Sequence, residues 1–558
     1  MGGAEIEKLS WHYPFWTALH MAANYGHSAV TSILIEHGAN VAAIDFNQQT
    51  PLHLAAESGH STATSILISH GAHTTNIDKN QRTPLHLAAK SGRTDVVSTL
   101  VKQGAKTAAI DLNQQTTLHL AAESNHSAAI NILVKYGANI TAIDSNQRTP
   151  LHLAVLSRNE EAIKVLLDLG ADMFYPDNVK RMPVNYAATY GSIGCIKAFI
   201  DAGFDINYRE PRRNRTVLHD AADSYKIDIL EYLLGQGGLE TVVNAQEING
   251  STALHLAVCG NPGVKSVRLL LQHGADMGVV SNEGYTPVHL AMKVRDFCSL
   301  RAFIDAGFDT NIRGGIGVHS GSTILHEAIY VAGPDGIKMI EYLLEQERGR
   351  AIINAQEDKG RTPLHLAARI GQIINLLNPL YGEAQEKVTQ GRKKVKLLVQ
   401  NGTDLKIKDN MGNTPAHVAA YRGDVGRMQP LVDCGLDFNS RGLCNRTILH
   451  AAVFGGRKML EYLLSQKGMK IIINARDSQG LTPLQLATLQ SFEKAEMVGL
   501  LLHYGANPAE KDGYWDQPIL DCTVQDEDGL ARKNLETVAL RFGEKGSIEY
   551  TNYYYSRS

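Results

Sequence analysis

Apolar positions recur along this chain in short blocks separated by glycines, and the blocks return at a fixed interval. In one copy of the pattern, an apolar and alanine-rich block begins at Pro51 and is broken by Gly59. A second apolar block over 61–69 precedes Gly71, and a turn-rich stretch over 72–82 follows. The pattern predicts two short helices and an extended link in each copy. Helices this short are marginal alone, so the copies must bury their apolar faces against one another.

The first helix of each copy carries its own start signal. Thr50 suits the N-cap, because its hydroxyl can accept a hydrogen bond from an unpaired backbone N–H. Pro51 suits the first helical position, where a missing N–H costs nothing. His53 stands at the third position, where a capping box places a Glu or Gln that reaches back to the cap. The tetrapeptide Thr-Pro-Leu-His at 50–53 therefore marks the beginning of a repeat.

This tetrapeptide and its near copies divide the chain into repeats. The first five starts are 33 residues apart and fall at Thr17, Thr50, Thr83, Thr116 and Thr149. Later starts follow at intervals of 33 to 52 residues and fall at Met182, Thr216, Thr252, Thr286, Thr323, Thr362, Thr414, Thr447 and Thr482. These starts define fourteen units, and residues 517–520 look like a degraded fifteenth start.

The repeated pattern T-P-L-H-x-A-A followed by L-L-x-x-G-A-D resembles the ankyrin repeat over residues 14–515. The resemblance implies an all-α repeat solenoid with a helix-turn-helix and a β-hairpin in each unit. It also implies a single elongated curved array, in which hairpin tips and first helices line the usual partner-binding surface. We expect four segments: an N-terminal segment (1–16), regular repeats 1–5 (17–181), repeats 6–14 (182–515), and a C-terminal cap and tail (516–558).

From residue 182 onward, a longer repeat of three units overlies the short one. Residues 198–205 return as 302–309 and, more weakly, as 431–437. Each copy is followed by Glu-Tyr-Leu-Leu and then by Asn-Ala, with the asparagines at 244, 354 and 474. This order suggests duplication of a three-unit module and a block boundary near residue 181. No flexible linker marks that boundary, so we expect one continuous solenoid.

A narrower resemblance covers two of the units. Residues 243–247 and 252–258 are similar to inhibitor-of-NF-κB proteins. Those proteins have six or seven units and an acidic tail, and this chain departs from them in both respects.

The hairpin tips of the regular block depart from the ankyrin pattern. Ankyrin repeats usually have glycine at the third tip position, because φ is often positive there. This chain has glutamine at that position, as Gln48, Gln81, Gln114 and Gln147. We expect an altered tip in which Asn47 and its equivalents take the left-handed conformation. The aspartates that enter these hairpins recur every 33 residues, which turn formation explains: Asp45, Asp78, Asp111 and Asp144.

Composition excludes several classes of protein. The 558-residue chain has a formal net charge of −3, which argues against a binder of nucleic acid or acidic membranes. No apolar run approaches the roughly 20 residues that span a bilayer, and no signal peptide is visible. The six cysteines form no CxxC pair, so we expect free thiols in a reducing compartment. We expect a monomer in the cytoplasm; the nucleus, or secretion into a host cell as an effector, stays open.

The 22 histidines raise the question of metal or acid–base chemistry. Twelve of them occupy one position of the repeat: His20, His53, His86, His119, His152, His219, His255, His289, His326, His365, His417 and His450. Asn185 and Gln485 replace them in the other two units. Because an amide and an imidazole share the ability to form hydrogen bonds, we expect a structural role at this position and not a catalytic one. His27, His60 and His126 between the helices are expected to be structural too. No known nucleotide, metal or hydrolase motif occurs, and we predict no enzyme, no cofactor and no metal.

Two basic clusters are candidates for docking an acidic partner protein. One lies in the hairpin of unit six: Tyr208, Arg209, Arg212, Arg213 and Arg215. The other belongs to an insertion of about 19 residues near 373–396 and contains Lys387, Arg392, Lys393, Lys394 and Lys396. The alternative for each cluster is a solvated loop. We favour the hairpin as a docking point, because hairpin tips face partners in ankyrin repeat proteins.

Further candidate contact residues lie in the regular block. Phe46, Arg82, Leu112 and Arg148 stand at hairpin tips, and Glu57, Lys90 and Glu123 stand at the ends of first helices. We predict a non-catalytic scaffold that binds partner proteins through a few anchor residues on this surface. The alternative is an adaptor or secreted effector whose C-terminal tail, 516–558, recruits a target protein to an enzyme complex.

Overall fold

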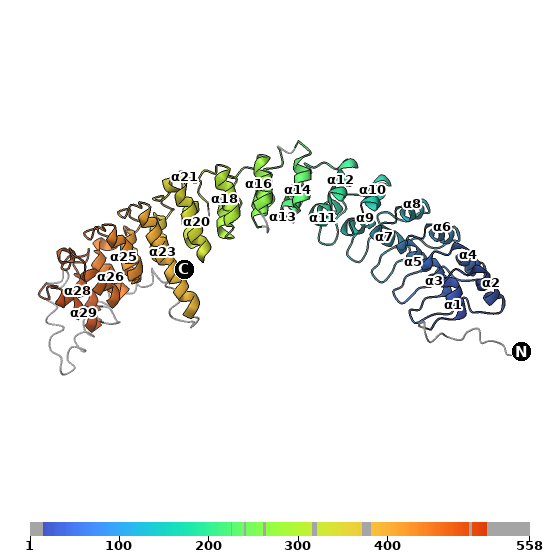
Figure 1. Cartoon of the computed structure of the whole chain (residues 1–558), viewed down its shortest axis with the longest axis horizontal. Coiled ribbons are helices and arrows are strands. Elements are labelled where there is room, and N and C mark those ends of the chain that lie inside the picture. The colour runs from blue at the N-terminus through green and yellow to red at the C-terminus, as the bar shows by residue number, and fades with distance from the viewer. Residues whose placement is uncertain are drawn as a thin grey trace. The chain divides into compact units, whose positions relative to one another are not determined.

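The computed structural model describes residues 15–224, 226–238, 241–259, 264–314, 321–370, 381–489 and 494–510, with the backbone alone at 381–388 and 494–495. The chain divides into two compact units, Met1–Asp276 and Met277–Ser558. Each unit is a stack of short helices (Figure 1). Among the described residues all regular structure is helical, apart from isolated antiparallel bridges at Ile110–Thr116 and Gly314–Ser322. The block boundary predicted near residue 181 falls inside the first unit and stays a prediction.

The first unit holds eight described helix pairs, each made of an odd-numbered first helix and an even-numbered second helix. Their bounds are α1 Ala18–Asn24, α2 Ser28–Glu36, α3 Pro51–Ser58, α4 Ser61–Ser69, α5 Pro84–Lys90, α6 Thr94–Lys102, α7 Thr117–Glu123, α8 Ser127–Lys135, α9 Pro150–Leu156, α10 Glu160–Asp168, α11 Pro183–Tyr190, α12 Ile193–Asp201, α13 Val217–Asp223, α14 Ile227–Leu234, α15 Ala253–Cys259 and α16 Val264–Gln272.

The second unit adds six described pairs, so eight and six give the fourteen predicted repeats. Their bounds are α17 Pro287–Lys293, α18 Phe297–Asp305, α19 Ile324–Tyr330, α20 Pro334–Glu345, α22 Pro363–Arg369, α23 Tyr381–Gln400, α24 Pro415–Arg422, α25 Val425–Asp433, α26 Ile448–Gly455, α27 Arg457–Leu464, α28 Pro483–Leu489 and α29 Lys494–His503. Outside the pairs lie α21 Glu347–Ala351 and two 3₁₀ turns, η2 Leu443–Asn445 and η3 Met469–Ile471. The start at 517–520 and the tail at 516–558 lie outside the described residues.

Small and branched apolar side chains fill the layers between neighbouring repeats. In α3, Leu52, Ala55 and Ala56 are fully buried. This helix packs against α1 and α5, the first helices on either side, and against its own partner α4. Burying one leucine contributes about 1.5–3 kcal/mol. Alanine at the contact positions lets the first helices approach closely, which explains why only 6% of the residues are aromatic.

The cap histidine joins each repeat to the next. Thr50 is the N-cap of α3, and its backbone N–H donates to His53 Nδ1 at 3.1 Å. Because Nδ1 accepts, the ring proton lies on Nε2, which donates to the Arg82 carbonyl of the next repeat at 3.0 Å. The same link between a cap threonine and the next repeat recurs at His20, His86, His119, His152, His219, His289, His326, His365, His417 and His450.

Amide side chains make the same link in the two repeats that lack the histidine. Asn185 Oδ1 accepts the Met182 N–H at 3.0 Å, and its Nδ2 donates to Asp220 at 2.7 Å. Gln485 Oε1 accepts the N–H of its cap threonine at 2.7 Å, and its Nε2 donates to the Glu510 carbonyl at 3.0 Å. These contacts confirm the prediction that the position is structural.

The histidines between the two helices of a repeat also have structural contacts, as predicted. His60 Nε2 lies 3.0 Å from the Asn24 carbonyl, at the end of the previous first helix. His126 Nε2 lies 3.0 Å from the Lys90 carbonyl in the same way. His27 is the N-cap residue of α2, and its backbone carbonyl accepts a hydrogen bond from the Thr31 hydroxyl. These residues are therefore part of the scaffold.

The tip of each regular hairpin is built on its aspartate. Asp45 Oδ1 accepts the backbone N–H groups of Asn47 and Gln49, each at 2.8 Å. The chain reverses between these two donors, so the residue between them, Gln48, takes the left-handed conformation with φ 59°. The prediction that Asn47 takes this conformation was wrong, because the aspartate fixes which residue turns. The equivalents of Gln48 also have positive φ: Gln81, Gln114 and Gln147.

The three-unit module has a structural basis in its recurring asparagine. Asn244 Oδ1 accepts a hydrogen bond at 2.7 Å from the backbone N–H of Asp276, a residue of the following repeat. Asn354 accepts from Asp404 at 2.9 Å, and Asn474 accepts from Asn507 at 2.8 Å. The asparagine therefore fixes the approach to the next hairpin once in every module. The additional turns α21 and η3 lie just before it in two of the modules.

Candidate functional site

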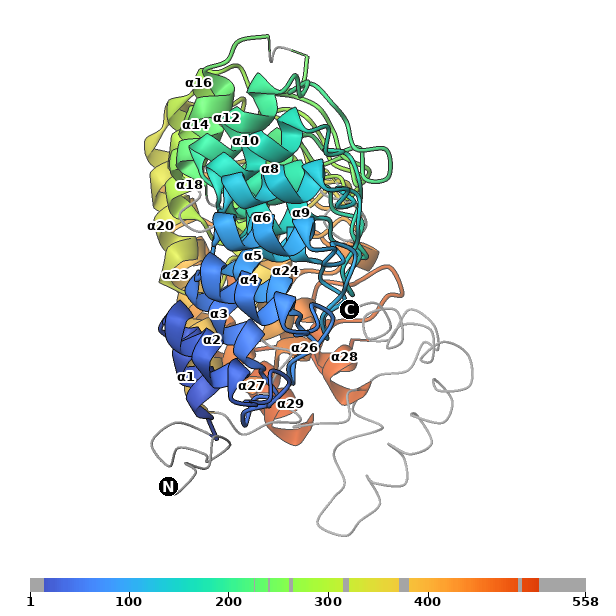
Figure 2. The same ribbon diagram turned by 90° about the vertical axis from the view of Figure 1, so that its right-hand side faces the viewer.

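The hairpin tips of the first unit form a continuous row along one edge of the helix stack (Figure 1 and Figure 2). Backbone hydrogen bonds join neighbouring tips from Asn47 to Asn178. The N–H of Lys79 donates to the Asn47 carbonyl at 2.9 Å, and the N–H of Leu112 donates to the Asn80 carbonyl at 3.1 Å. The N–H of Ser145 donates to the Asn113 carbonyl at 3.0 Å. A side chain on one tip therefore keeps a fixed neighbour on the next tip.

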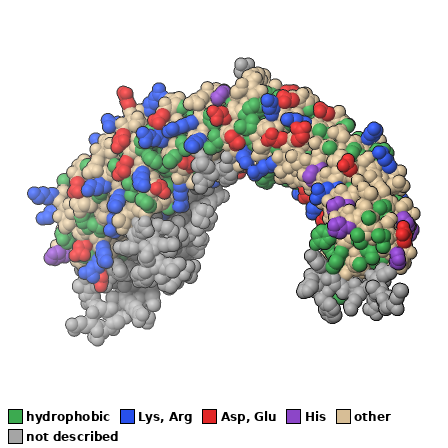
Figure 3. All heavy atoms as spheres, turned by 45° about the vertical axis from the view of Figure 1, so that its right-hand side comes forward, with side chains coloured by type: hydrophobic (Ala, Val, Ile, Leu, Met, Phe, Trp, Pro, Cys, Tyr) green, Lys and Arg blue, Asp and Glu red, His purple; other side chains and the backbone are tan. Residues whose placement is uncertain are grey.

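Two of the predicted tip residues present large apolar side chains to solvent. Phe46 is 68% exposed and Leu112 is 57% exposed. The Phe46 ring stacks on Phe15 with 6.3 Å between centroids, and the Lys79 ammonium lies 6.0 Å from the Phe46 centroid. On the face shown in Figure 3, hydrophobic side chains gather near the amino-terminal end of the first unit. The predicted residues at the ends of first helices are exposed too: Glu57, Lys90 and Glu123.

The two predicted tip arginines are engaged within the fold. Arg82 Nη2 lies 2.8 Å from Asp78 Oδ2, across the turn that the aspartate builds. Arg148 lies over the Tyr186 ring, 5.9 Å from its centroid, and its Nε is 4.0 Å from Asp177. Both side chains are partly buried. Arg82 and Arg148 therefore stabilise the hairpin tips.

Arg215 of the basic hairpin is the centre of an ion network. Its guanidinium lies 3.2 Å from Asp220, 2.9 Å from Asp223 and 2.8 Å from Glu247. Burial raises the pKa of Asp220 to about 6, although Arg215 and the Asn185 amide favour its charged form. Glu247 belongs to the next hairpin, so the network ties two hairpins together. All three nitrogens of the Arg215 guanidinium are therefore paired with carboxylates.

The other three arginines of this hairpin stay at its surface. We call Arg209, Arg212 and Arg213 the arginine tip; all three are exposed. The Glu210 carboxylate accepts the backbone N–H groups of Arg212 at 2.9 Å and Arg213 at 2.6 Å, which fixes the turn. Among the described residues, no carboxylate forms an ion pair with these three guanidinium groups. Tyr208 packs inward against Phe174, with 4.8 Å between ring centroids.

The second basic cluster is dispersed by the fold. Much of the insertion lengthens helix α23, and residues 371–380 lie outside the described residues. Lys394 is buried, and its Nζ donates to the carbonyls of Ile329 at 2.8 Å and Val331 at 2.6 Å. Burial lowers the pKa of Lys394 to about 8. Arg392 pairs with Asp424 at 2.9 Å. Lys393 and Lys396 are exposed, and the Lys387 side chain lies outside the description. The alternative of a solvated basic loop is therefore wrong for residues 381–396, because they belong to helix α23, which turns Lys394 into the core.

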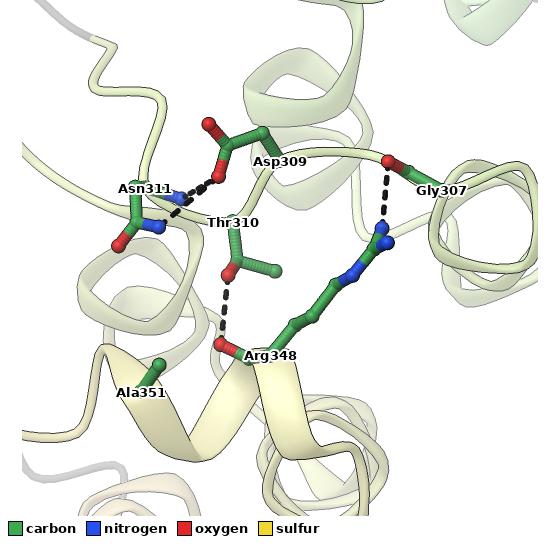
Figure 4. Close-up of a pocket in the computed structure, with 6 residues that line it drawn as sticks. All are labelled: Gly307, Asp309, Thr310, Asn311, Arg348 and Ala351. Carbon is green, nitrogen blue, oxygen red and sulfur yellow. Dashed lines mark hydrogen bonds between the residues drawn. The ribbon is translucent and has the colours of Figure 1, made fainter.

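A shallow pocket in the second unit has its polar groups bonded to one another (Figure 4). Arg348 of α21 donates to the Gly307 carbonyl at 2.8 Å, and its own carbonyl accepts from the Thr310 hydroxyl at 2.8 Å. Asn311 donates to Asp309 at 3.1 Å. These contacts brace α21 against the preceding hairpin. No sequence pattern pointed to Arg348, since its partners lie about one repeat away.

Among the described residues, no group of three or more His, Cys, Asp or Glu side chains could hold a metal ion. No helix in the described part of the chain is long and apolar enough to cross a membrane.

Four exposed isoleucines were missed by the sequence reasoning. They stand directly before the hairpin aspartates, as Ile44, Ile77, Ile110 and Ile143, and they are 58%, 51%, 51% and 42% exposed. We call this set the isoleucine ladder. The signal that could have found it is the strict 33-residue spacing together with side-chain alternation, which turns the neighbour of a buried aspartate outward.

Comparison with protein families agrees with this architecture. A model described as ankyrin repeats in three copies matches residues 5–78, 73–144, 106–177, 170–245, 238–314, 384–474 and 426–512, and one described as ankyrin repeat matches 359–384. The chain belongs to the ankyrin repeat family. The all-α repeat solenoid that the ankyrin resemblance implied is thereby confirmed, although the links between repeats form no β-strand among the described residues.

Curated relatives of this ankyrin repeat protein are diverse. It is 25% identical to the E3 ubiquitin-protein ligase KEG of Arabidopsis thaliana over 333 residues, which are 49% of this chain and 20% of the relative. It is 27% identical over 316 residues to human transient receptor potential cation channel subfamily A member 1, covering 52% of this chain and 27% of the relative. Mouse NF-kappa-B inhibitor delta is 31% identical over 189 residues, covering 31% and 53%. The chain thus spans about a fifth to a half of these relatives.

Among solved structures, the crystal structure of the human ASB11 ankyrin repeat domain is similar, with 28% sequence identity and a TM-score of 0.36. The match covers 40% of this chain and 99% of that chain.

Proposed function

We propose that this ankyrin repeat protein is a non-catalytic scaffold that binds partner proteins along the hairpin tips and first-helix ends of its first unit. The proposal rests on the contrast between buried and exposed positions of each hairpin and first helix. The buried Asp45 and His53 make their hydrogen bonds within the fold. Phe46 on the hairpin and Glu57 on α3 are exposed. Side chains that are fixed but uncovered suit recognition, because little order is lost on binding.

The chemistry of these positions suits a protein partner. Phe46 and Leu112 offer large apolar surfaces of the kind that become anchors when a partner covers them. Glu57, Lys90 and Glu123 supply charges around them, as the polar rim of an interface does. The engaged arginines, Arg82 and Arg148, support the frame.

Lysine-directed crosslinking of the full chain to proteins that it captures tests the proposal. Lys79 lies on a tip and Lys90 at the end of a first helix. Lys102, Lys135 and Lys164 lie on second helices of the same unit and are also exposed, so they are the matched controls. We expect partner crosslinks at Lys79 and Lys90 and few at the three controls.

Crosslinks that concentrate on Lys102, Lys135 and Lys164 would place the partner on the opposite helices and refute this surface. The predicted cytoplasmic location and monomeric state stay predictions. The adaptor alternative depends on residues 516–558, which the structure does not describe.

A further inference from the structure

The isoleucine ladder is the middle line of a nearly uncharged face. The residues two positions before and two positions after each isoleucine are exposed with it. The residues two positions before the isoleucines are Ala42, Thr75, Ala108 and Thr141. Those two positions after them are Phe46, Lys79, Leu112 and Ser145. Lys79 is the one charged residue among these twelve described positions. Four consecutive hairpins therefore present an apolar strip.

The same structural position changes character in the next two repeats. After Ile143 it is occupied by Pro176 and then by Arg209. Arg209 stands with Arg212 and Arg213 in the arginine tip, so the strip runs from an apolar end to a basic end within the first unit.

The exposure of Arg209 has an identifiable cause. Its counterparts in the later modules, Arg313 and Arg441, donate across to the next repeat, to the carbonyls of Gln356 and Arg476. In the first module, Asn214 Nδ2 makes this contact instead, to the Gln246 carbonyl at 2.8 Å. The bond between repeats is thus already made, and the Arg209 guanidinium is left at the surface.

The spacing of the strip suits a helix better than an extended strand. Packed helices lie about 8–10 Å apart, and the tips from Asn47 to Asn178 are joined by backbone hydrogen bonds, so residues at this position recur about every 10 Å. An α-helix rises about 1.5 Å per residue, so every seventh residue advances about 10.5 Å and returns to nearly the same face. A strand covers that distance in about three residues, which turns alternate contacts away from the strip.

We propose that the isoleucine ladder and the arginine tip together bind one amphipathic helix of a partner protein, with apolar residues at seven-residue intervals and an acidic cluster at one end. The proposal rests on the scaffold function and adds the kind of partner. Apolar contacts with the ladder supply affinity, and the arginine tip sets the direction in which the helix lies. A protein helix is favoured over a nucleic acid, because five of the six residues at this position, the four isoleucines and Pro176, carry no charge that could pair with phosphates.

The test uses labelled helical peptides of about 36 residues, the length that about 50 Å requires. The acidic probe carries four leucines at seven-residue intervals followed by four glutamates, and the basic probe carries four lysines instead. Fluorescence anisotropy with the full chain measures both affinities. We expect the acidic probe to bind about tenfold more tightly than the basic probe, with a smaller difference at high salt.

Two variants separate the ends of the strip. In R209E/R212E/R213E the preference for the acidic probe should invert, so that the basic probe binds more tightly. The control K102E/K135E/K164E reverses the same number of charges on second helices, and it should change the affinity for each probe less than about twofold. In I77S/I110S both probes should weaken by about tenfold, whereas V30S/I33S on α2 should leave them unchanged. Circular dichroism and urea midpoints check that every variant is folded.

Three results would overturn the proposal. The first is equal binding of the two probes by the folded wild type. The second is a single-stranded DNA of similar charge that competes fully with the acidic probe, which would make the arginine tip a general polyanion site. The third is tight binding of a probe whose helix is broken by prolines, which would make the occupant an extended segment. Crosslinks at Lys79 and Lys90 would leave the scaffold function standing in each case.

Discussion

At the residue scale, the cap histidine acts as a neutral hydrogen-bonding group. Burial lowers the pKa of His53 to about 4, and the contact with the Arg82 carbonyl offsets this only in part. A charged ring would lose its hydration and would point a second donor at the N–H of Thr50, which is itself a donor. The ring is therefore uncharged at neutral pH, accepts at Nδ1 and donates at Nε2.

Replacing His53 by glutamine should cost less than replacing it by alanine. Gln485 already makes both contacts in the last described repeat, so an amide can reach the cap and the next carbonyl. H53A leaves a buried N–H and a buried carbonyl without partners, and we expect it to lower the free energy of unfolding by about 2–4 kcal/mol. H53Q should lose less than about half of that. Urea unfolding at pH 7 measures both, and equal losses would show that the hydrogen bonds contribute little.

Acid should destabilise the array through the same residues. Burial lowers the pKa to about 4 at His53, His219, His289, His326, His417 and His450. An unfolded histidine has a pKa of about 6.5, so between these values the unfolded chain binds more protons than the folded chain. Stability is therefore lost as the pH falls from about 6.5 toward 4. We expect a lower thermal midpoint at pH 5 than at pH 7 and a smaller drop in H53Q. Identical drops would show that another group titrates.

At the scale of the element, glycines and cap residues mark where helices begin and end. Ser61–Ser69 forms α4 with the predicted bounds, and Gly59 ends α3 with φ 94°. These ends follow from single residues, so they can be predicted from the sequence. The left-handed residue of the tip cannot, because its place depends on which N–H groups the Asp45 carboxylate accepts. Helix ends depend on the conformational preference of one residue, whereas the left-handed residue of the tip depends on the geometry of several hydrogen bonds.

Glycine at the tip should stabilise the regular hairpins. Gln48 takes a left-handed conformation that strains a side-chain-bearing residue by about 1 kcal/mol. We expect Q48G to raise the free energy of unfolding by up to about 1 kcal/mol, since glycine lacks the Cβ responsible for the strain. Q49G is the matched control and should destabilise, because Gln49 is buried and has no positive φ. Equilibrium urea unfolding of both variants decides the point, and a loss of stability in Q48G would mean that the side chain has a role of its own.

At the scale of the whole molecule, the contacts that matter join neighbouring repeats. Within the first unit, α7 packs against α5 and α9, and His119 reaches the Arg148 carbonyl 29 residues away. This explains why the fold could be predicted and parts of the site could not. The 33-residue period alone identifies the stack of repeats. Two features of the site depend instead on partners in other repeats: the ion pair of Arg215 with Glu247, and the burial of Lys394 against the carbonyls of Ile329 and Val331.

Such an array should lose stability locally when one repeat is damaged. Leu118 in α7 is fully buried, and L118A should cost about 2–5 kcal/mol through the cavity that it leaves. Because each repeat contacts only its neighbours, we expect faster amide hydrogen exchange in α5 to α10 and unchanged exchange in α26 and α27. Hydrogen exchange with mass spectrometry on the full chain measures both regions at once. An equal rise in α26 and α27 would show instead that the repeats unfold as one cooperative body, in which case a partner bound to the first unit would stabilise every repeat.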